Sequence, residues 1–183
     1  VMLTDYVVID LEMTGLNAKT DRILEAGAAR VRGNVVTAAF SEIINPKREL
    51  SEKVISLTGI TNEMAVQGKE MDATLMAFLD FIGEDILVGQ NVIFDYSFLK
   101  QWAVNHKRTF ERNAVDTLKL ARKFLPQEQK KDLASLCSYF GIERVHAHRA
   151  LDDVMETQQI FEQLQKMYEA DRKSTRLNSS HHD

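Results

Sequence analysis

The sequence predicts a mixed α/β domain whose sheet begins with antiparallel strands and is covered by helices. Three observations predict this fold class. Apolar, strand-like runs come first, and the pair Gly33-Asn34 joins two of them as a hairpin turn. Later segments alternate between short apolar runs and longer stretches with apolar residues at helical spacing. Since no internal repeat and no linker precedes Asp171, we expect one domain over residues 1–170.

Five segments have the pattern of strands. The first is apolar and ends in an acid, and Pro46 ends the third. The fourth is fully apolar, which is typical of a strand buried in a sheet. The expected strands are residues 6–10, 22–32, 35–44 and 86–88, with a short strand at best around Val115.

Six helices are expected from apolar spacing and from capping residues. Serine and aspartate favour helix starts, and glycine favours the position just past a helix end. The first, fourth and fifth helices have such caps in Ser51, Asp116 and Asp132. The expected helices are residues 51–57, 74–82, 94–105, 116–124, 132–140 and 149–169.

Composition narrows the class of protein. The 183 residues are 44% hydrophobic and 27% charged, an ordinary balance for a globular domain, and no apolar run is long enough to span a membrane. The net charge of −4 argues against coating of long duplexes but not against an enzyme that grips a few nucleotides. We expect no signal peptide before Tyr6, and a reducing cytoplasm, because one cysteine excludes an internal disulfide. That cysteine, Cys137, has apolar neighbours at helical spacing, so we expect its thiol to be buried.

Residues 171–183 (DRKSTRLNSSHHD) differ in character from the rest of the chain. They contain one large apolar residue and no periodicity, so we expect a disordered tail. The string also resembles the translation of a sequencing-library adapter, which suggests an assembly artefact. Without its three basic and two acidic residues the net charge is −5.

Two acids at the end of the first strand are the first candidates for a site. Asp10 and Glu12 are two residues apart, so both side chains point to one face of an extended chain. Unpaired buried charge is costly, so either a cation lies there or the strand end is hydrated by solvent. Thr14-Gly15 follows as a turn in which the backbone can approach a ligand.

Further candidates come from later segments. Asp95 lies at the start of a helix, where the helix dipole alone also favours an acid, and Asn91 before it is a turn former. His148 and Asp153 are separated by about 140° on an ideal helix, so they share a pocket only if His148 lies in the preceding loop. Carboxylates gathered in this way suit two divalent cations held against a phosphate, and therefore a nuclease. The pair His146 and His148 does not predict zinc, because no cysteine or third histidine clusters with it.

The strings DLEMTG, NVIFD and H-x4-D (His148 to Asp153) in this order resemble the DEDDh 3′–5′ exonucleases, a DnaQ-like group within the ribonuclease-H-like fold. The sequence of residues 5–165 also resembles epsilon-type proofreading exonucleases and the exonuclease domain of Gram-positive replicative polymerases. The resemblance implies a mixed five-stranded sheet and two Mg²⁺ or Mn²⁺ ions per site. It further implies cleavage from the 3′ end of single-stranded or frayed DNA to nucleoside 5′-monophosphates in proofreading or repair, with a DNA polymerase as a partner.

The resemblance also implies residue roles. Asp10, Glu12 and Asp153 would hold one ion, Asp10 would bridge to the second, Asp95 would act directly or through water, and His148 would be the general base. The terminal nucleotide would be lined by Thr14, Gly15, Leu16, Asn91, Phe94 and Phe98. Phe98 is also suited to a helix stripe that faces the core.

Two departures leave alternatives open. Gln90 stands where many members have histidine, which affects the expected nucleotide pocket. The motif DLEMTGL, with Met13, has the sequence found in oligoribonucleases. An RNA-trimming enzyme with the same chemistry is therefore the alternative most similar to the DNA exonuclease. A non-catalytic module that binds nucleic acid or a polymerase is the more distant one. The sequence gives no oligomeric state.

Overall fold

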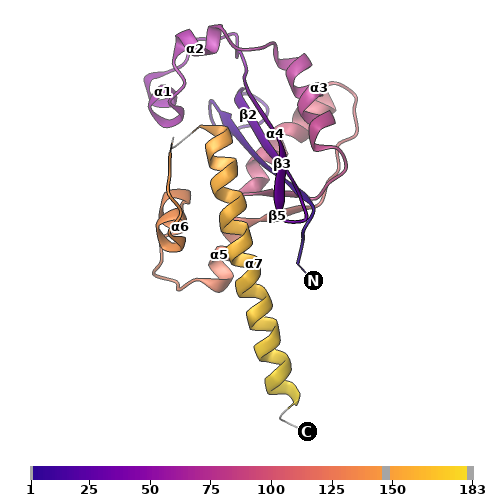
Figure 1. Cartoon of the computed structure of the whole chain (residues 1–183). Helices are drawn as coiled ribbons and strands as arrows, with labels where there is room; N and C mark the ends of the chain where they lie inside the picture. The colour runs from indigo at the N-terminus through magenta and orange to yellow at the C-terminus, as the bar shows by residue number, and fades with distance from the viewer. Residues whose placement is uncertain (1, 146–148, 181–183) are drawn as a thin grey trace.

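The fold is that of a computed structural model, which describes residues 2–145 and 149–180. One sheet lies at its centre, with helices on both sides (Figure 1). Its strands lie in the order β3-β2-β1-β4-β5. They are β1 (Tyr6–Met13), β2 (Ile23–Arg32), β3 (Val35–Ile43), β4 (Leu87–Gly89) and β5 (Ala114–Asp116).

The pairing confirms the predicted antiparallel start. β1 pairs antiparallel with β2, and β2 with β3, whereas β4 joins β1 in parallel and β5 joins β4 in parallel. β1 runs further than expected, because its ladder with β2 continues to the pair Met13 and Ile23. Asp10 and Glu12 therefore lie inside a paired strand rather than at its end.

The described residues form seven helices, of which six were predicted. They are α1 (Glu52–Thr58), α2 (Asn62–Val66), α3 (Met71–Ile82), α4 (Val92–Asn105), α5 (Thr117–Phe124), α6 (Leu133–Phe140) and α7 (Ala150–Ser180). The side chains of Ser51, Asp116 and Asp132 accept backbone N–H bonds as N-caps, as expected. The missed helix, α2, has five residues, too few for its periodicity to appear in the sequence.

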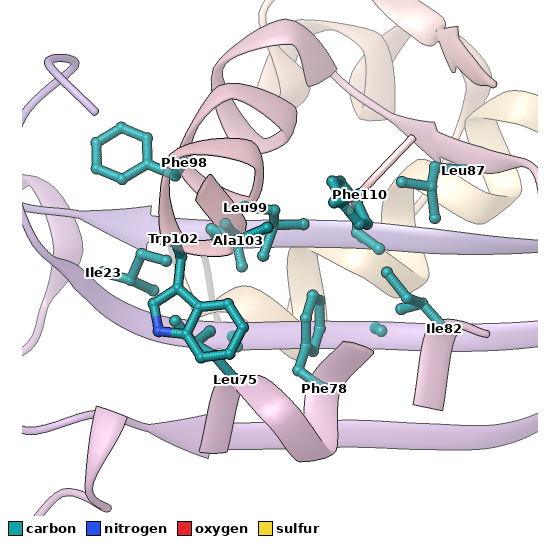
Figure 2. Close-up of a cluster of buried hydrophobic side chains, with 14 of the residues drawn as sticks. Ile23, Leu75, Phe78, Ile82, Leu87, Phe98, Leu99, Trp102, Ala103 and Phe110 are labelled. Carbon is teal, nitrogen blue, oxygen red and sulfur yellow. The ribbon is translucent and has the colours of Figure 1, made fainter. Parts of the chain in front are cut away.

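Hydrophobic clusters cover both faces of the sheet. The larger one joins alternate residues of β1, such as Val7 and Ile9, to α3 and α4. Figure 2 shows its aromatic members, with Phe98 and Trp102 at one end and Phe110 at the other. On the opposite face, residues of β1 and β2 pack against α7. Asp10 and Glu12 alternate along β1 with Val7 and Ile9 of the larger cluster, so their side chains lie on the face of the sheet that α7 covers.

The start of α7 lies directly on β2. A Cβ atom at Gly27 would be 2.9 Å from both the carbonyl carbon and the Cβ of Ala150, so only glycine permits this approach. The buried Glu25 accepts a hydrogen bond from the backbone N–H of Ala150 at 2.8 Å and forms an ion pair with Arg149 at 2.8 Å. These contacts fix the first turn of α7 against the centre of the sheet.

α7 continues past the expected end at Glu169, and its last turns extend away from the sheet (Figure 1). The helix contains neither glycine nor proline, so nothing in its sequence stops it. Residues 173–178 are exposed, and their helical form therefore depends on local backbone bonds and not on packing. In the part of the chain that the structure describes, no helix combines the length and apolar character needed to cross a membrane.

Candidate active site

Three carboxylates meet between β1 and the first turn of α7. Asp10, Glu12 and Asp153 each have an oxygen that lies within 4.8 Å of the corresponding oxygens of the other two. The strand supplies two of them because its alternate side chains share a face. The helix supplies the third because Glu25 and Gly27 hold its start against β2.

Burial and mutual repulsion act on the acids of β1. The Oδ2 atom of Asp10 is buried and has no hydrogen-bond partner among the described residues. Burial raises the pKa of Asp10 well above its usual value, and the charges of Asp95 and Glu12 raise it further. Burial, followed by the charges of Asp153 and Glu25, raises the pKa of Glu12 to about 9. These two carboxyl groups are thus short of positive charge.

Asp95 lies next to this group of three and is held by the backbone of β1. It is in the first turn of α4, and its Oδ1 accepts the N–H of Leu11 at 2.9 Å. Burial raises the pKa of Asp95 to about 8, although two backbone N–H bonds act in the opposite direction. Its charge contributes to the raised pKa of Asp10, so the four acids form one electrostatic group.

The donor set fits a hard divalent cation. Mg²⁺ and Mn²⁺ prefer oxygen ligands, and a buried carboxylate oxygen without a partner offers one. A cation would also offset the repulsion that raises the pKa values of Asp10 and Glu12. The residues Asp10, Glu12 and Asp153 are therefore the ones that could hold such an ion.

Thr14, Gly15 and Leu16 form the turn that follows β1. The hydroxyl of Thr14 donates to Asp21 at 3.1 Å, and a Cβ atom at Gly15 would lie 2.4 Å from the Asp21 carboxylate. The absence of a side chain at Gly15 thus makes room for Asp21. Leu16 projects into solvent with 65% of its surface exposed, although it is a large apolar residue.

Asn91, Phe94 and Phe98 lie at the start of α4 and along it. Asn91 has a left-handed backbone (φ 53°), and its N–H donates to Asp116 at 2.8 Å. Phe94 is half-buried. Phe98 is 3% exposed and packs in the hydrophobic core, as expected for a residue on the core-facing stripe of the helix (Figure 2).

The side-chain amide of Gln90 is hydrogen-bonded within the protein at both its nitrogen and its oxygen. Its Nε2 donates to the carbonyl of Lys131 at 2.8 Å, and its Oε1 accepts the hydroxyl of Thr117 at 2.6 Å. The side chain therefore links β4 to α5 and to the segment before α6.

His148 and His146 lie outside the described residues, so the predicted general base stays a prediction. Arg144 and Arg149 precede and follow that segment, and both bind carboxylates of the site region. Neither arginine was singled out from the sequence, nor were their partners Glu25 and Glu156. An available signal was the acid at position 25 within the apolar strand ILEAGAARV.

Cys137 is buried in the cluster between α6 and α7, as predicted. Burial, together with the nearby charge of Glu156, raises the pKa of its thiol to about 11. A thiol with such a high pKa is a poor nucleophile at neutral pH. The cysteine is therefore part of the core.

Comparison with known proteins identifies the family. A family model described as "Exonuclease" matches residues 7–161. The chain is 37% identical over 157 residues to the DNA polymerase III epsilon subunit of Aquifex aeolicus, covering 85% of this chain and 78% of that protein. It is 38% identical over 157 residues to the PolC-type DNA polymerase III of Bacillus subtilis, covering 83% of this chain but only 11% of the polymerase.

Solved structures show the same fold at lower identity. Exonuclease X in complex with 5′ overhanging duplex DNA has a TM-score of 0.70 at 22% identity, with 88% of this chain and 91% of that chain covered. Escherichia coli exonuclease I in complex with a dA16 oligonucleotide has a TM-score of 0.73 at 19% identity, with 86% of this chain and 40% of that chain covered. The five-stranded sheet is thus the predicted ribonuclease-H-like one, and the chain belongs to the DnaQ-like exonuclease family.

Proposed function

We propose that this chain is a metal-dependent 3′–5′ exonuclease that removes nucleoside 5′-monophosphates from single-stranded or frayed DNA. The observation that carries the proposal is the group of three carboxylates within 4.8 Å, one of which has a buried oxygen that no described residue hydrogen-bonds. Similarity to an epsilon subunit and to PolC-type polymerases supports DNA as the substrate and a replicative polymerase as the partner.

Asp10, Glu12 and Asp153 would hold a Mg²⁺ or Mn²⁺ ion, with Asp10 shared with a second ion and Asp95 nearby. Bound ions would supply positive charge that makes water more acidic and stabilises the leaving 3′ oxygen. His148 would accept the proton of the attacking water, a role that suits an imidazole with a pKa near 6.5. Thr14, Gly15, Leu16, Asn91 and Phe94 would surround the terminal nucleotide, with Phe98 supporting them from the core.

A direct assay uses the full chain with Mg²⁺ or Mn²⁺ and a single-stranded DNA labelled at its 3′ end. Release of the label as a mononucleotide is the expected result. Asp153→Ala and His148→Ala should abolish release, whereas Asp152→Ala, its neighbour outside the group of three, should retain it. Internal cleavage products, or full activity in EDTA, would contradict the proposal.

The RNA-trimming alternative is tested by competition between DNA and RNA oligomers of the same sequence. The 2′-hydroxyl is the feature by which a pocket separates the two. We expect DNA to be degraded faster, in line with the DNA polymerase relatives. A non-catalytic binding module would bind neither Mg²⁺ nor Mn²⁺ at the carboxylates, which calorimetric titration of either metal would reveal.

A further inference from the structure

Arg144 connects the site to a buried acid that the proposed chemistry does not use. It lies in the segment between α6 and α7. Its Nη2 donates to Oδ1 of Asp153 at 3.1 Å, and its Nε donates to Oε2 of Glu156 at 3.0 Å. The guanidinium is a rigid planar fork, so these two contacts fix its orientation.

The three side chains are largely removed from solvent. Asp153 and Glu156 are 8% and 4% exposed, and the Arg144 side chain is 19% exposed. The two acids are three residues apart on α7 and so share one face of the helix. Glu156 is thus placed to hold Arg144, and Arg144 is placed to hold Asp153.

A bond to one oxygen restricts the rotation of the Asp153 carboxylate. The contact between Arg144 and Asp153 therefore favours one orientation of this group relative to Asp10 and Glu12. Hydrogen bonds to metal-binding carboxylates tune metal sites in this way, and their loss typically costs about 10–100-fold in metal affinity or activity. Arg149 does not duplicate this contact, because it binds Glu25 on β2.

We propose that Arg144 is a positioning residue, which Glu156 holds in place so that it orients Asp153 for binding of the divalent cation. The inference rests on the proposed metal-dependent function and deepens it. The orienting effect of Arg144 on Asp153 should strengthen cation binding, whereas its positive charge alone should weaken it. A guanidinium that only repelled the cation would weaken binding, and its removal would then tighten it.

The experiment is calorimetric titration of the metal-free full chain with Mn²⁺. Arg144→Gln is compared with Arg108→Gln, which removes the same charge from an exposed position after α4. We expect Arg144→Gln to weaken Mn²⁺ binding about 10–100-fold and Arg108→Gln to leave it unchanged. The exonuclease activity of Arg144→Gln should recover as Mn²⁺ is raised, which a merely unfolded variant would not do.

Two further variants separate orientation from charge. Arg144→Lys keeps the charge but loses the planar fork, so its binding should stay weakened. Glu156→Asp keeps the charge but shortens the side chain that holds Nε of Arg144, so weaker Mn²⁺ binding in it is expected even if Arg144→Gln does not fold. Full affinity in Arg144→Lys, or unchanged or tighter binding in Arg144→Gln and Glu156→Asp, would overturn the inference. Failure of the unaltered chain to bind Mn²⁺ would instead defeat the proposed function, and the inference with it.

Discussion

Two sets of carboxylates, one buried and one half-buried, differ in what neutralises them. Glu25 on β2 and Glu156 on α7 each bind an arginine, at 2.8 Å and 3.0 Å respectively. Asp10 and Glu12 on β1 bind no arginine among the described residues and have raised pKa values instead. One buried oxygen of Asp10 has no partner there, which is also true of Oε1 of Glu156, but the other oxygen of Glu156 binds Arg144. The first set fastens α7 and the segment before it, and the second faces the space between β1 and α7.

The difference is the one expected between acids that hold the fold and acids that bind a cation. A buried acid that only holds the fold needs a partner within the protein, because an unpaired ion costs several kcal/mol. Within residues 2–145 and 149–180, Asp10 and Glu12 have no ion-pair partner, although two arginines lie on neighbouring segments. This arrangement is expected where the missing positive charge comes from outside the chain.

The largest expected effect comes from removing a charge of the unpaired set. Asp10→Asn should lower exonuclease activity at least about 10²-fold, since the charge stabilisation supplied by a bound cation is worth several kcal/mol. The same substitution should raise the melting temperature in EDTA, because it removes a negative charge whose buried oxygen has no partner among the described residues. The exonuclease activity is measured with the 3′-labelled strand and the melting temperature by thermal unfolding, both on one preparation of the variant. A variant that is inactive but less stable would remove Asp10 from the functional set.

The opposite outcome is expected for the paired set. Glu25→Ala removes the acceptor of the Ala150 N–H and of Arg149, so it should lower the free energy of unfolding by about 2–3 kcal/mol. Urea unfolding in EDTA measures the change, with Glu49→Ala at an exposed loop position as the control. Equal stability of the two variants would show that the start of α7 does not depend on Glu25.

The pH dependence of stability distinguishes the sets without mutation. The unfolded chain releases the protons of Glu12 and Asp95 near pH 4, whereas the folded protein keeps them until pH values of about 9 and about 8. Their contribution is therefore complete below about pH 4 and is lost as the pH rises through about 8–9. In EDTA, urea midpoints should fall between pH 5 and 9, and Mg²⁺ should reduce the fall. A flat profile would show that these carboxyls ionise normally.

The smallest effect is expected at an exposed ion pair. His106 stacks on Trp102 and lies 3.1 Å from Asp72, and the carbonyl of Trp102 together with Asp72 raises the pKa of the imidazole. Its contribution is present below pH 6.5 and is lost as the pH rises through the raised pKa. His106→Gln should therefore lower stability slightly at pH 5.5 and not at pH 8.5, as measured by urea unfolding. An effect as large as that of Glu25→Ala would remove the contrast between solvated and buried pairs.

The sequence predicted the parts of the fold that depend on neighbouring residues. The Gly33-Asn34 turn and the cap at Ser51 involve side chains and backbone a few positions apart, and both are present in the structure. The short helix α2 and the extension of β1 to Met13 were missed. The first is too short to have a periodicity, and the second depends on pairing with another strand.

For the site, the sequence by itself determined the acids of the three ordered motifs and their places on a strand and two helices. The tertiary structure alone decided which buried acids have partners. Glu25 accepts the N–H of Ala150 across 125 residues, and Arg149 binds the same carboxylate. Local patterns cannot encode such meetings, because a charge becomes paired or unpaired only when distant segments pack together.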